Sequence, residues 1–555
     1  MDFPLGRACP NDLIPHWESP ISLFLPHQDR PLCKKFVKSS SYSRMPEPLV
    51  VDRADLAVQS TIRLPLPLVV GNCDYAEREA LLRRMDDLLV SSGAESAFME
   101  SWVMDGIEAL RRATKGTPKP MTDRRRAAFH RQASMALRCT VARILSNESH
   151  RSFSVHLAES PLLQWFCRTE RLDGQVRVPS KSSLQRMEAE VPTEVLQRVH
   201  RGLILRAATP EADGQPSLGL AEQVDLSVAW VDTTCAKLNI HYPTDWVLLR
   251  DATRSVIAAI ETIRRHGLIH RMPEPSSFVR TMNQHAMAMA ASSRKGRGGD
   301  KERDRKKTLR AMKIVVGTVR KHGQRYRELL AAAWPDSDLS RAQADLILER
   351  LDRVLEAIPV AVKQAHERII GGRQVPNEDK LHSLYQQHAQ VYVRGKSGAD
   401  VEFGLKMLLA ESAEGLIVDG ELLDIIDDTQ LLLPAVKRIQ QHYGDKACQT
   451  VVTDRGFTSA ANSAALTTVG VIDGTLPKKP DELGKRLKDP ILRKLHIRRA
   501  QTEARIGIFK ANFLGDHLPT KGREAQERFV AWATLAHNLW VMARLERRRS
   551  LALAS

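Results

Sequence analysis

The sequence predicts a mixed α/β fold, in which a strand-bearing core is interrupted by a large helical insertion and preceded by a mostly helical region. Residues 224–232 and 448–454 include short apolar segments that each end in an aspartate, and residues 401–410 largely alternate between apolar and polar side chains. Both patterns are typical of β-strands. Residues 75–207 and 245–394 instead carry apolar side chains at helical spacing over long stretches.

The composition is that of a globular protein with an excess of positive charge. Of the 555 residues, 43% are hydrophobic and 27% are charged, and 83 Lys and Arg against 66 Asp and Glu give a net charge of +17. That excess favours a polyanionic partner, most simply nucleic acid. A basic enzyme without such a partner would have the same composition, so charge alone leaves that alternative open.

The cysteines and the hydropathy argue against several other classes of protein. The 7 cysteines are widely scattered and form no C-x-x-C pair, so the sequence predicts neither a zinc site of that kind nor a disulfide framework. Free thiols suit a reducing cytosol. No apolar run approaches the ~20 residues that span a membrane, and we expect no signal peptide.

The N-terminal segment, residues 1–74, is predicted to be poorly ordered. Its first 50 residues are rich in Pro and Ser and include the run Ser39-Ser40-Ser41-Tyr42-Ser43. Met45 offers an alternative translation start.

The helical region 75–207 contains a candidate DNA-binding motif. Pro179-Ser180 is a helix-start signal with Ser180 as the N-cap, and the helix that follows carries Lys181 and Arg186. Such a helix start offers backbone N–H groups, hydroxyls and cations to a DNA phosphate, as in a helix-turn-helix. We therefore expect Lys181 and Arg186 to bind DNA, although an ordinary capped helix would have the same pattern.

The helical insertion is predicted over residues 257–394. It has a break at 292–299, where glycines alternate with cations. Between Arg294 and Lys307 there are eight Lys or Arg against three Asp or Glu, a net +5. This stretch is either a DNA-contacting loop or a solvated linker, and the sequence does not decide between them.

The strand-bearing core is predicted in two segments, 222–256 and 395–545. The first segment holds a strand at 224–232 that is apolar on both faces and has Asp232 at its C-terminal end. The second segment is predicted to contain, in order, a strand at 401–410, its hairpin partner at 416–420, a helix at 429–443 closed by Gly444, a strand that ends at Asp454, a short helix, a strand at 469–476, a basic loop at 478–494, a helix at 496–510 and an apolar helix at 524–545. Residues 546–555 form a basic tail.

The late helix carries a third acid between two cations. Arg499, Glu503 and Lys510 are four and seven residues apart, so they lie along one helical face. On an isolated helix this pattern would be a solvated salt-bridge face. Asp232 and Asp454 change the interpretation, because two acids at strand ends plus one on a helix are the ligands that a two-metal phosphoryl-transfer site needs.

The three acids Asp232, Asp454 and Glu503 are therefore the predicted catalytic residues and metal ligands. Two Mg²⁺ (or Mn²⁺) ions about 3.5–4 Å apart activate an oxygen nucleophile and relieve charge on the phosphate and the leaving oxygen. Mg²⁺ takes oxygen ligands and keeps some waters, so a few carboxylates suffice. The order of hairpin-bearing strands, helix, strand with acid, helix, strand and helix with acid is that of a ribonuclease-H-like core, with the helical insertion between its first and second strands.

Several segments resemble the DDE transposases of bacterial insertion sequences, most closely those of the ISNCY type. The resemblance covers roughly residues 150 to 545. It is carried by Val231-Asp232-Thr233-Thr234, Asn239-Ile240-His241-Tyr242-Pro243-Thr244-Asp245, Val401-Glu402-Phe403-Gly404, Ala410-Glu411-Ser412-Ala413-Glu414-Gly415-Leu416, Thr453-Asp454-Arg455-Gly456-Phe457 and Ala536-His537-Asn538-Leu539-Trp540.

The late helix also resembles the family signature Y-x-x-R-x-x-x-E-x-x-x-x-x-x-K. Here the signature runs through His496, Arg499, Glu503 and Lys510. Three of its four positions match at the right spacing, and His496 stands where tyrosine is usual.

The resemblance implies a transposase that binds the terminal inverted repeats of its own element. It would hydrolyse one strand at each end with metal-activated water, and the freed 3′-hydroxyl would attack target DNA. The three acids would ligate the metals, Arg499 and Lys510 would hold DNA phosphates near the cleaved bond, and Arg455 is a weaker candidate for the same role. Because strand transfer needs two element ends in one complex, a homodimer or larger assembly on double-stranded DNA is implied. The expected location is the bacterial cytoplasm with the nucleoid, without a membrane.

Three alternatives stay open. The first is a decayed or domesticated transposase that binds DNA without cleaving it, and the second is a nuclease of the same fold. The third is a helical scaffold without a nucleic-acid role, which would leave the net charge unexplained.

Overall fold

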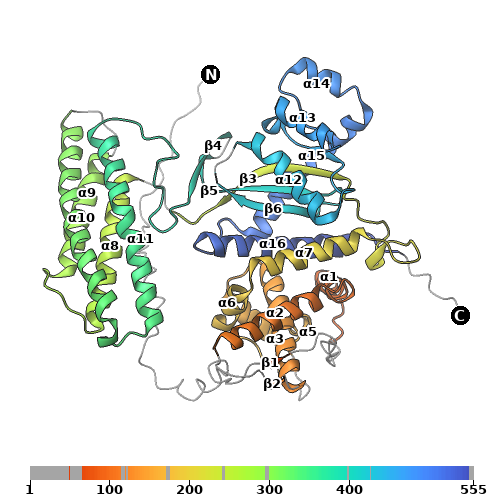
Figure 1. Cartoon of the computed structure of the whole chain (residues 1–555), viewed down its shortest axis with the longest axis horizontal. Coiled ribbons are helices and arrows are strands. Elements are labelled where there is room, and N and C mark those ends of the chain that lie inside the picture. The colour runs from red at the N-terminus through yellow and green to blue at the C-terminus, as the bar shows by residue number, and fades with distance from the viewer. Residues whose placement is uncertain are drawn as a thin grey trace. The chain divides into compact units, whose positions relative to one another are not determined.

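The computed structural model is a mixed α/β protein, mostly helical, with a six-stranded mixed sheet (Figure 1). It describes residues 49–50, 66–113, 119–120, 123–169, 176–240, 244–293, 299–396, 399–424 and 427–548. Most of the N-terminal segment predicted to be poorly ordered, with Met45, lies outside the described residues, as do residues 294–298 of the glycine-rich break. Within the described ranges, no helix is both long enough and apolar enough to cross a membrane.

The chain divides into two compact units. The smaller one comprises Met1–Arg53 and Asp105–Met121, and the larger one comprises Ala54–Met104 and Thr122–Ser555. In the smaller unit, β1 (Leu49–Val50) and β2 (Lys119–Pro120) pair in parallel. Apart from the second half of α2, the elements described below belong to the larger unit.

The predicted helical region is confirmed as a run of seven helices. They are α1 (Cys73–Ser91), α2 (Ala94–Ala113), α3 (Asp123–Leu145), α4 (His150–Glu159), α5 (Pro161–Cys167), α6 (Lys181–Glu190) and α7 (Thr193–Ala208). Ser180 is the N-cap of α6, as predicted, and its Oγ accepts the Ser183 N–H at 3.3 Å. The C-terminal helix α16 (Arg523–Arg544) packs against α1, α3 and α7, so the helical region shares one hydrophobic core with the sheet.

The sheet has the order β4-β5-β3-β7-β8, with β6 also paired to β5. Its strands are β3 (Val228–Lys237), β4 (Gln390–Lys396), β5 (Ala399–Glu411), β6 (Ile417–Leu423), β7 (Thr450–Val452) and β8 (Ile472–Asp473). The pairs β3–β5, β4–β5 and β5–β6 are antiparallel, whereas β3–β7 and β7–β8 are parallel. The predicted hairpin is thus confirmed as β5 and β6, but the strand expected at 469–476 shrinks to the two residues of β8.

The predicted end of the first strand is wrong. Asp232 lies in the interior of β3, which continues to Lys237 because the long strand β5 still pairs with it; Asp232 stands opposite Leu409. The parallel neighbour β7, however, pairs only with Val228–Trp230. Asp232 therefore lies just beyond the reach of β7, on the edge where that strand stops.

The remaining helices of the core are α12 (Asp428–Tyr443), the 3₁₀ turn Arg455–Phe457, α13 (Ala460–Thr468), α14 (Pro480–Arg486), α15 (Pro490–Phe509) and the π-helical turn Lys510–Leu514. The helix ending at Gly444 is confirmed, and Gly444 has the positive φ of +93° that favours glycine. The basic loop expected at 478–494 is wrong. Pro480 and Pro490 each open a helix there, because proline fits the first turn, where its missing N–H is not needed.

The helical insertion is an antiparallel bundle with its own core (Figure 1). Its helices are α8 (Asp245–Arg265), α9 (Pro275–Ser293), α10 (Gly299–Ala333) and α11 (Arg341–Ala365), and a π-helical turn, His366–Ile370, ends α11. The apolar face of α8 enters this core from Leu248 onward. The boundary predicted at residue 257 therefore falls inside α8.

Candidate active site

The helix α15 is fixed against β3 by Trp230. The Trp230 Nε1 donates a hydrogen bond to the Leu495 carbonyl oxygen at 3.1 Å, and the Arg498 guanidinium lies 4.2 Å from the centre of the Trp230 ring. This arrangement sets which face of α15 points at the sheet.

A buried carboxylate at the end of β5 holds the same helix. Glu411, which is 5% exposed, forms an ion pair with Arg498 and accepts a hydrogen bond from the Thr502 Oγ1 at 2.7 Å. Because Arg498 and Thr502 lie one turn apart on α15, Glu411 fixes the helix along its axis as well as around it.

The opposite flank of α15 places the predicted cations beside β3. The Arg499 Nη2 lies 3.2 Å from the Asp232 Oδ2 and 4.0 Å from the Glu503 Oε1. Farther along, the Lys510 Nζ donates to the Thr234 Oγ1 at 3.2 Å. Thus Asp232 and Glu503 share one guanidinium, and Lys510 lies on the same stretch of β3.

Asp454 comes to this site from the neighbouring strand. It follows β7 by two residues and is the N-cap of the 3₁₀ turn, where its Oδ1 accepts the Gly456 N–H at 2.8 Å. Since β3 and β7 are parallel neighbours, the two aspartates emerge at the same end of the pair. The charge of Asp454 acts on Asp232, as the pKa of Asp232 shows.

Burial raises the pKa of the Asp232 carboxyl to about 6. The Arg499 guanidinium opposes this rise, and the negative charges of Asp454 and Glu503 add to it. The Asp232 Oδ1 also accepts the Thr233 N–H at 2.7 Å. Burial thus outweighs the effect of the neighbouring arginine on this carboxyl.

A fourth carboxylate, Asp428 at the start of α12, was not predicted to belong here. Its Oδ1 accepts the Thr233 Oγ1–H at 3.2 Å and lies 2.5 Å from the Lys406 Nζ. A Cβ added to Gly456 would lie 3.0 Å from the Asp454 Oδ1 and 3.1 Å from the Asp428 Oδ2, so the two carboxylates meet on either side of this glycine. In the sequence, an acid at a helix start is typical of a helix N-terminus. Only the folded arrangement, in which the start of α12 meets β3 at Thr233, brings Asp428 to this site.

The site has the ligand types of a divalent-cation site but is not assembled around one. Within the described ranges, no three His, Cys, Asp or Glu side chains stand close enough together to hold a metal ion. Arg499 lies between Asp232 and Glu503, and the Glu503 side chain is 64% exposed. Carboxylate oxygens are nevertheless the ligands that Mg²⁺ and Mn²⁺ prefer. The donor types therefore suit such an ion, but in this arrangement the Arg499 guanidinium lies beside Asp232 and Glu503.

The other predicted residues divide between this site and a distant helix. Arg455 is exposed beside Asp454. Lys181 and Arg186 lie on α6, which packs against α3 and α4 rather than against β3, β7 or α15. The structure thus brings the three acids and Arg499 together, with Lys510 and Arg455 at the edges, and places Lys181 and Arg186 elsewhere.

His496, which stands at the tyrosine position of the signature, is one turn before Arg499 on α15. Both of its ring nitrogens are buried and have no hydrogen-bond partner in the part of the chain that the structure describes. Burial lowers the pKa of His496, and the nearby charges of Arg499 and Arg486 lower it further. The ring is therefore neutral near pH 7 and adds no cation to the site.

Comparison with known protein families, curated proteins and solved structures finds no match to this chain.

Proposed function

We propose that the protein is a DDE transposase with a ribonuclease-H-like core, which cuts and joins DNA strands with two divalent metal ions. The observation that carries this proposal is that Asp232 and Glu503 share the Arg499 guanidinium while the charge of Asp454 acts on Asp232. The three acids come from β3, the turn after β7 and α15, which are far apart in the sequence. The element order, with an antiparallel hairpin followed by a parallel acid-bearing strand and an acid-bearing helix, supports the proposed core.

In this proposal each side chain has a defined role. Asp232, Asp454 and Glu503 hold Mg²⁺ or Mn²⁺, and two such ions, when bound, supply an activated water and neutralise charge on the phosphate. Arg499 releases the carboxylates and turns to a DNA phosphate, which its planar donors suit. Lys510, 3.2 Å from Thr234 on the same strand as Asp232, holds the next phosphate along, and Arg455 is a further candidate.

The proposed partner is double-stranded DNA, namely the terminal inverted repeats of a mobile element and its target. The net charge of +17 supports a polyanionic partner. Joining two element ends in one event requires at least two active sites, so the proposed working form is a homodimer or larger assembly on DNA. Lys181, at the capped start of α6, and Arg186, farther along the same helix, are proposed to bind the repeat.

The test is an assay of strand transfer. The protein is incubated with Mg²⁺, a duplex carrying the inverted repeat found beside its gene, and a supercoiled target plasmid. A transposase joins the labelled 3′ end to the plasmid. A nuclease of the same fold releases only hydrolysed fragments, and that result would contradict the proposal.

A second candidate is a DNA-binding protein that descends from such an enzyme and has lost cleavage. The Arg499 guanidinium between Asp232 and Glu503 favours it, because an arginine can replace a metal ion as a permanent counter-charge. Repeat binding without nicking in Mg²⁺ or in Mn²⁺ would establish this alternative.

A further inference from the structure

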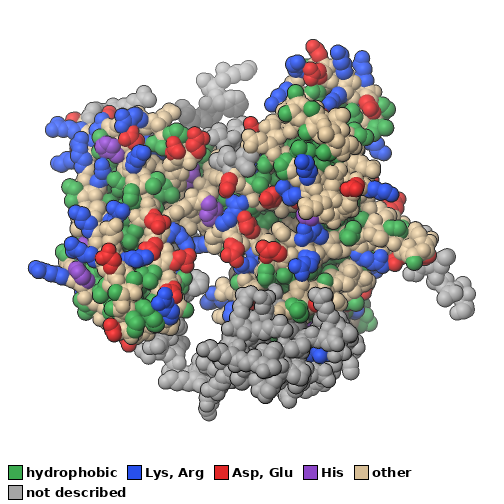
Figure 2. Space-filling view, viewed as in Figure 1, with side chains coloured by type: hydrophobic (Ala, Val, Ile, Leu, Met, Phe, Trp, Pro, Cys, Tyr) green, Lys and Arg blue, Asp and Glu red, His purple; other side chains and the backbone are tan. Residues whose placement is uncertain are grey.

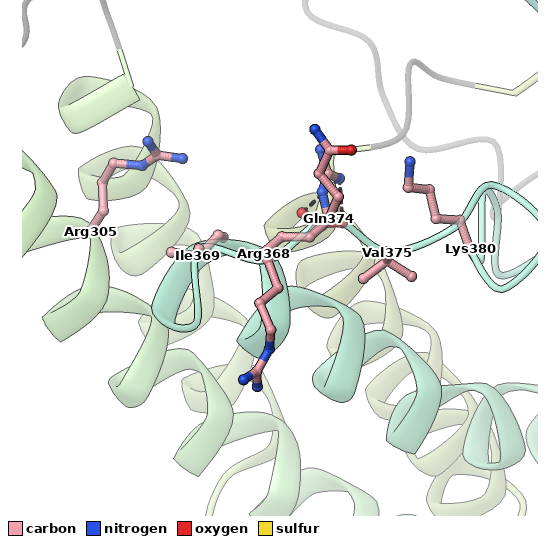
Figure 3. Close-up of a pocket in the computed structure, with 9 residues that line it drawn as sticks. Arg305, Arg368, Ile369, Gln374, Val375 and Lys380 are labelled. Atoms are coloured by element: carbon pink, nitrogen blue, oxygen red, sulfur yellow. Dashed lines mark hydrogen bonds and ion pairs between the residues drawn. The ribbon is translucent and has the colours of Figure 1, made fainter.

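A basic cavity of about 490 Å³ lies in the helical insertion, away from the candidate active site. It stands where α10 begins and α11 ends. Arg305 projects from α10, and Gln374, Val375 and Lys380 lie across from it on the segment that follows α11 (Figure 3). On the face shown in Figure 2, Lys and Arg side chains are dense at this end of the bundle.

Some of the charge in the cavity is neutralised within the protein. The Arg368 Nη1 lies 2.9 Å from both Asp245 carboxylate oxygens, and the Gln364 Nε2 donates to the Asp245 Oδ1 at 2.8 Å. Arg373 forms an ion pair with Glu367, whose Oε2 accepts the Arg373 Nε–H at 2.5 Å. Each of these two arginines therefore already has a carboxylate counter-charge within the protein.

Arg305 and Lys380 are the lining cations that form no ion pair with a carboxylate among the described residues. The Arg305 Nε is buried and has no hydrogen-bond partner among the described residues. The Lys380 Nζ donates to the Asn377 Oδ1 at 2.7 Å, which is a neutral partner. A buried guanidinium donor without a partner costs free energy, and two cations that form no ion pair with a carboxylate in the described part of the chain suit an anion with several acceptor oxygens.

The lining of the cavity selects a phosphate over a base. Its residues are Asp245, Arg305, Arg368, Ile369, Gly372, Arg373, Gln374, Val375 and Lys380. None of these carries an aromatic ring on which a base would stack, whereas stacking supplies much of the affinity of base-binding sites. Cations without aromatic side chains are typical of contacts to the sugar-phosphate backbone, which carry no sequence information.

We propose that this cavity, defined by Arg305 and Lys380, binds a backbone phosphate of DNA and makes the helical insertion a second, sequence-independent DNA contact. The inference rests on the proposed function, because it supposes that DNA is the substrate. It also favours one of the two interpretations of the basic stretch between Arg294 and Lys307. In this proposal the start of α10, which holds Arg305, contacts DNA.

The experiment compares DNA binding by three forms of the full-length protein. The pocket variant is Arg305→Gln with Lys380→Gln. The control, Lys321→Gln with Arg350→Gln, removes the same charge from exposed positions of α10 and α11. Lys321 lies ~24 Å along the helix axis from Arg305. Affinity for a labelled duplex of unrelated sequence is measured over a range of salt concentrations, and thermal unfolding is followed with and without inorganic phosphate.

We expect the pocket variant to bind the duplex about tenfold more weakly than wild type and its log–log salt slope to fall by about 1, since one phosphate contact is lost. The control keeps the wild-type affinity and slope within about twofold. Equal binding by the two variants would overturn the inference while leaving the proposed function intact. Phosphate-dependent stabilisation that the pocket variant loses, together with unchanged DNA binding, would reassign the cavity to a small phosphate ligand. A wild-type protein that binds no DNA would contradict the inference and the proposed function together.

Discussion

Among single residues, Arg499 offers a way to separate the proposed metal binding from the proposed DNA cleavage. Its guanidinium contacts Asp232 and Glu503, so in the proposed site it would compete with a divalent ion for their oxygens. We expect Arg499→Gln to bind Mn²⁺ more tightly than wild type, yet to nick repeat DNA about tenfold more slowly, because a charge-assisted contact to phosphate is lost. Titration calorimetry and a nicking assay measure the two effects.

Arg493→Gln is the matched control, since Arg493 is an exposed arginine on the same helix. It should change neither quantity. If Arg499→Gln weakened Mn²⁺ binding and nicking in parallel, Arg499 would instead be a support for the metal site and not its competitor.

The residue pattern predicted some site members and missed others for a physical reason. Asp454 and Glu503 could be found because a strand end and a helical spacing are local signals. The position of Asp232 inside β3 depends on how far β5 and β7 extend along it, and Asp428 arrives from α12 through strand pairing. Neither position can be predicted from the neighbouring sequence, because both depend on contacts between segments that are far apart in the chain.

At the scale of elements, Glu411 determines where α15 lies. It is buried with Arg498 and Thr502, and breaking such a pair from one side leaves an uncompensated buried charge. We expect Glu411→Gln to lower the free energy of unfolding by about 3 kcal/mol. Urea titration measures this change.

The exposed pair of Glu482 with Lys479 on α14 provides the comparison. Glu482→Gln should change the unfolding free energy by less than about 0.5 kcal/mol. Similar, small losses in both variants would show that Glu411 does not anchor the helix.

Whole helices and the central hairpin were predictable because their periodicities extend over many residues. β8 was not, because a two-residue strand has no periodicity. The prediction of a basic loop at 478–494 was wrong because it relied on composition. Lysines and prolines suggest a loop, but these prolines stand at helix starts, where their fixed φ is favourable.

At the scale of the whole molecule, a buried polar cluster joins the helical region to the sheet. The Asn538 side chain on α16 accepts the Ile417 N–H at 2.9 Å and donates to the Ile417 carbonyl oxygen at 2.8 Å, and its Nδ2 also lies 2.6 Å from the His200 Nε2 on α7. The His537 Nδ1 lies 3.0 Å from the Asn538 Oδ1. Burial lowers the pKa of both His200 and His537 to about 4.

This cluster predicts that acid destabilises the fold. Below pH 6.5 the unfolded chain protonates these histidines while the folded chain does not, so stability is full above that pH and falls as the pH approaches 4. Between pH 7.5 and pH 5 we expect a loss of about 2 kcal/mol for each histidine. Urea titrations at the two pH values measure it.

His200→Gln keeps an acceptor for Asn538 but does not titrate. The loss of unfolding free energy that this cluster causes between pH 7.5 and pH 5 should therefore be about half as large in the variant as in wild type. A pH dependence equal to that of wild type would show that His200 is not held neutral by the fold.

The decisive experiment for the proposed active site is metal-dependent nicking of repeat DNA by wild type, Asp454→Asn and Asp516→Asn. Asp516 is an exposed acid in the loop after the π-helical turn, so its variant changes charge equally without touching the site. The account predicts nicking at the repeat end in Mg²⁺ by wild type and Asp516→Asn, none with EDTA, and at least a 100-fold loss in Asp454→Asn, on the order of the cost of removing one main electrostatic group from an active site. Nicking that survives in Asp454→Asn would contradict it.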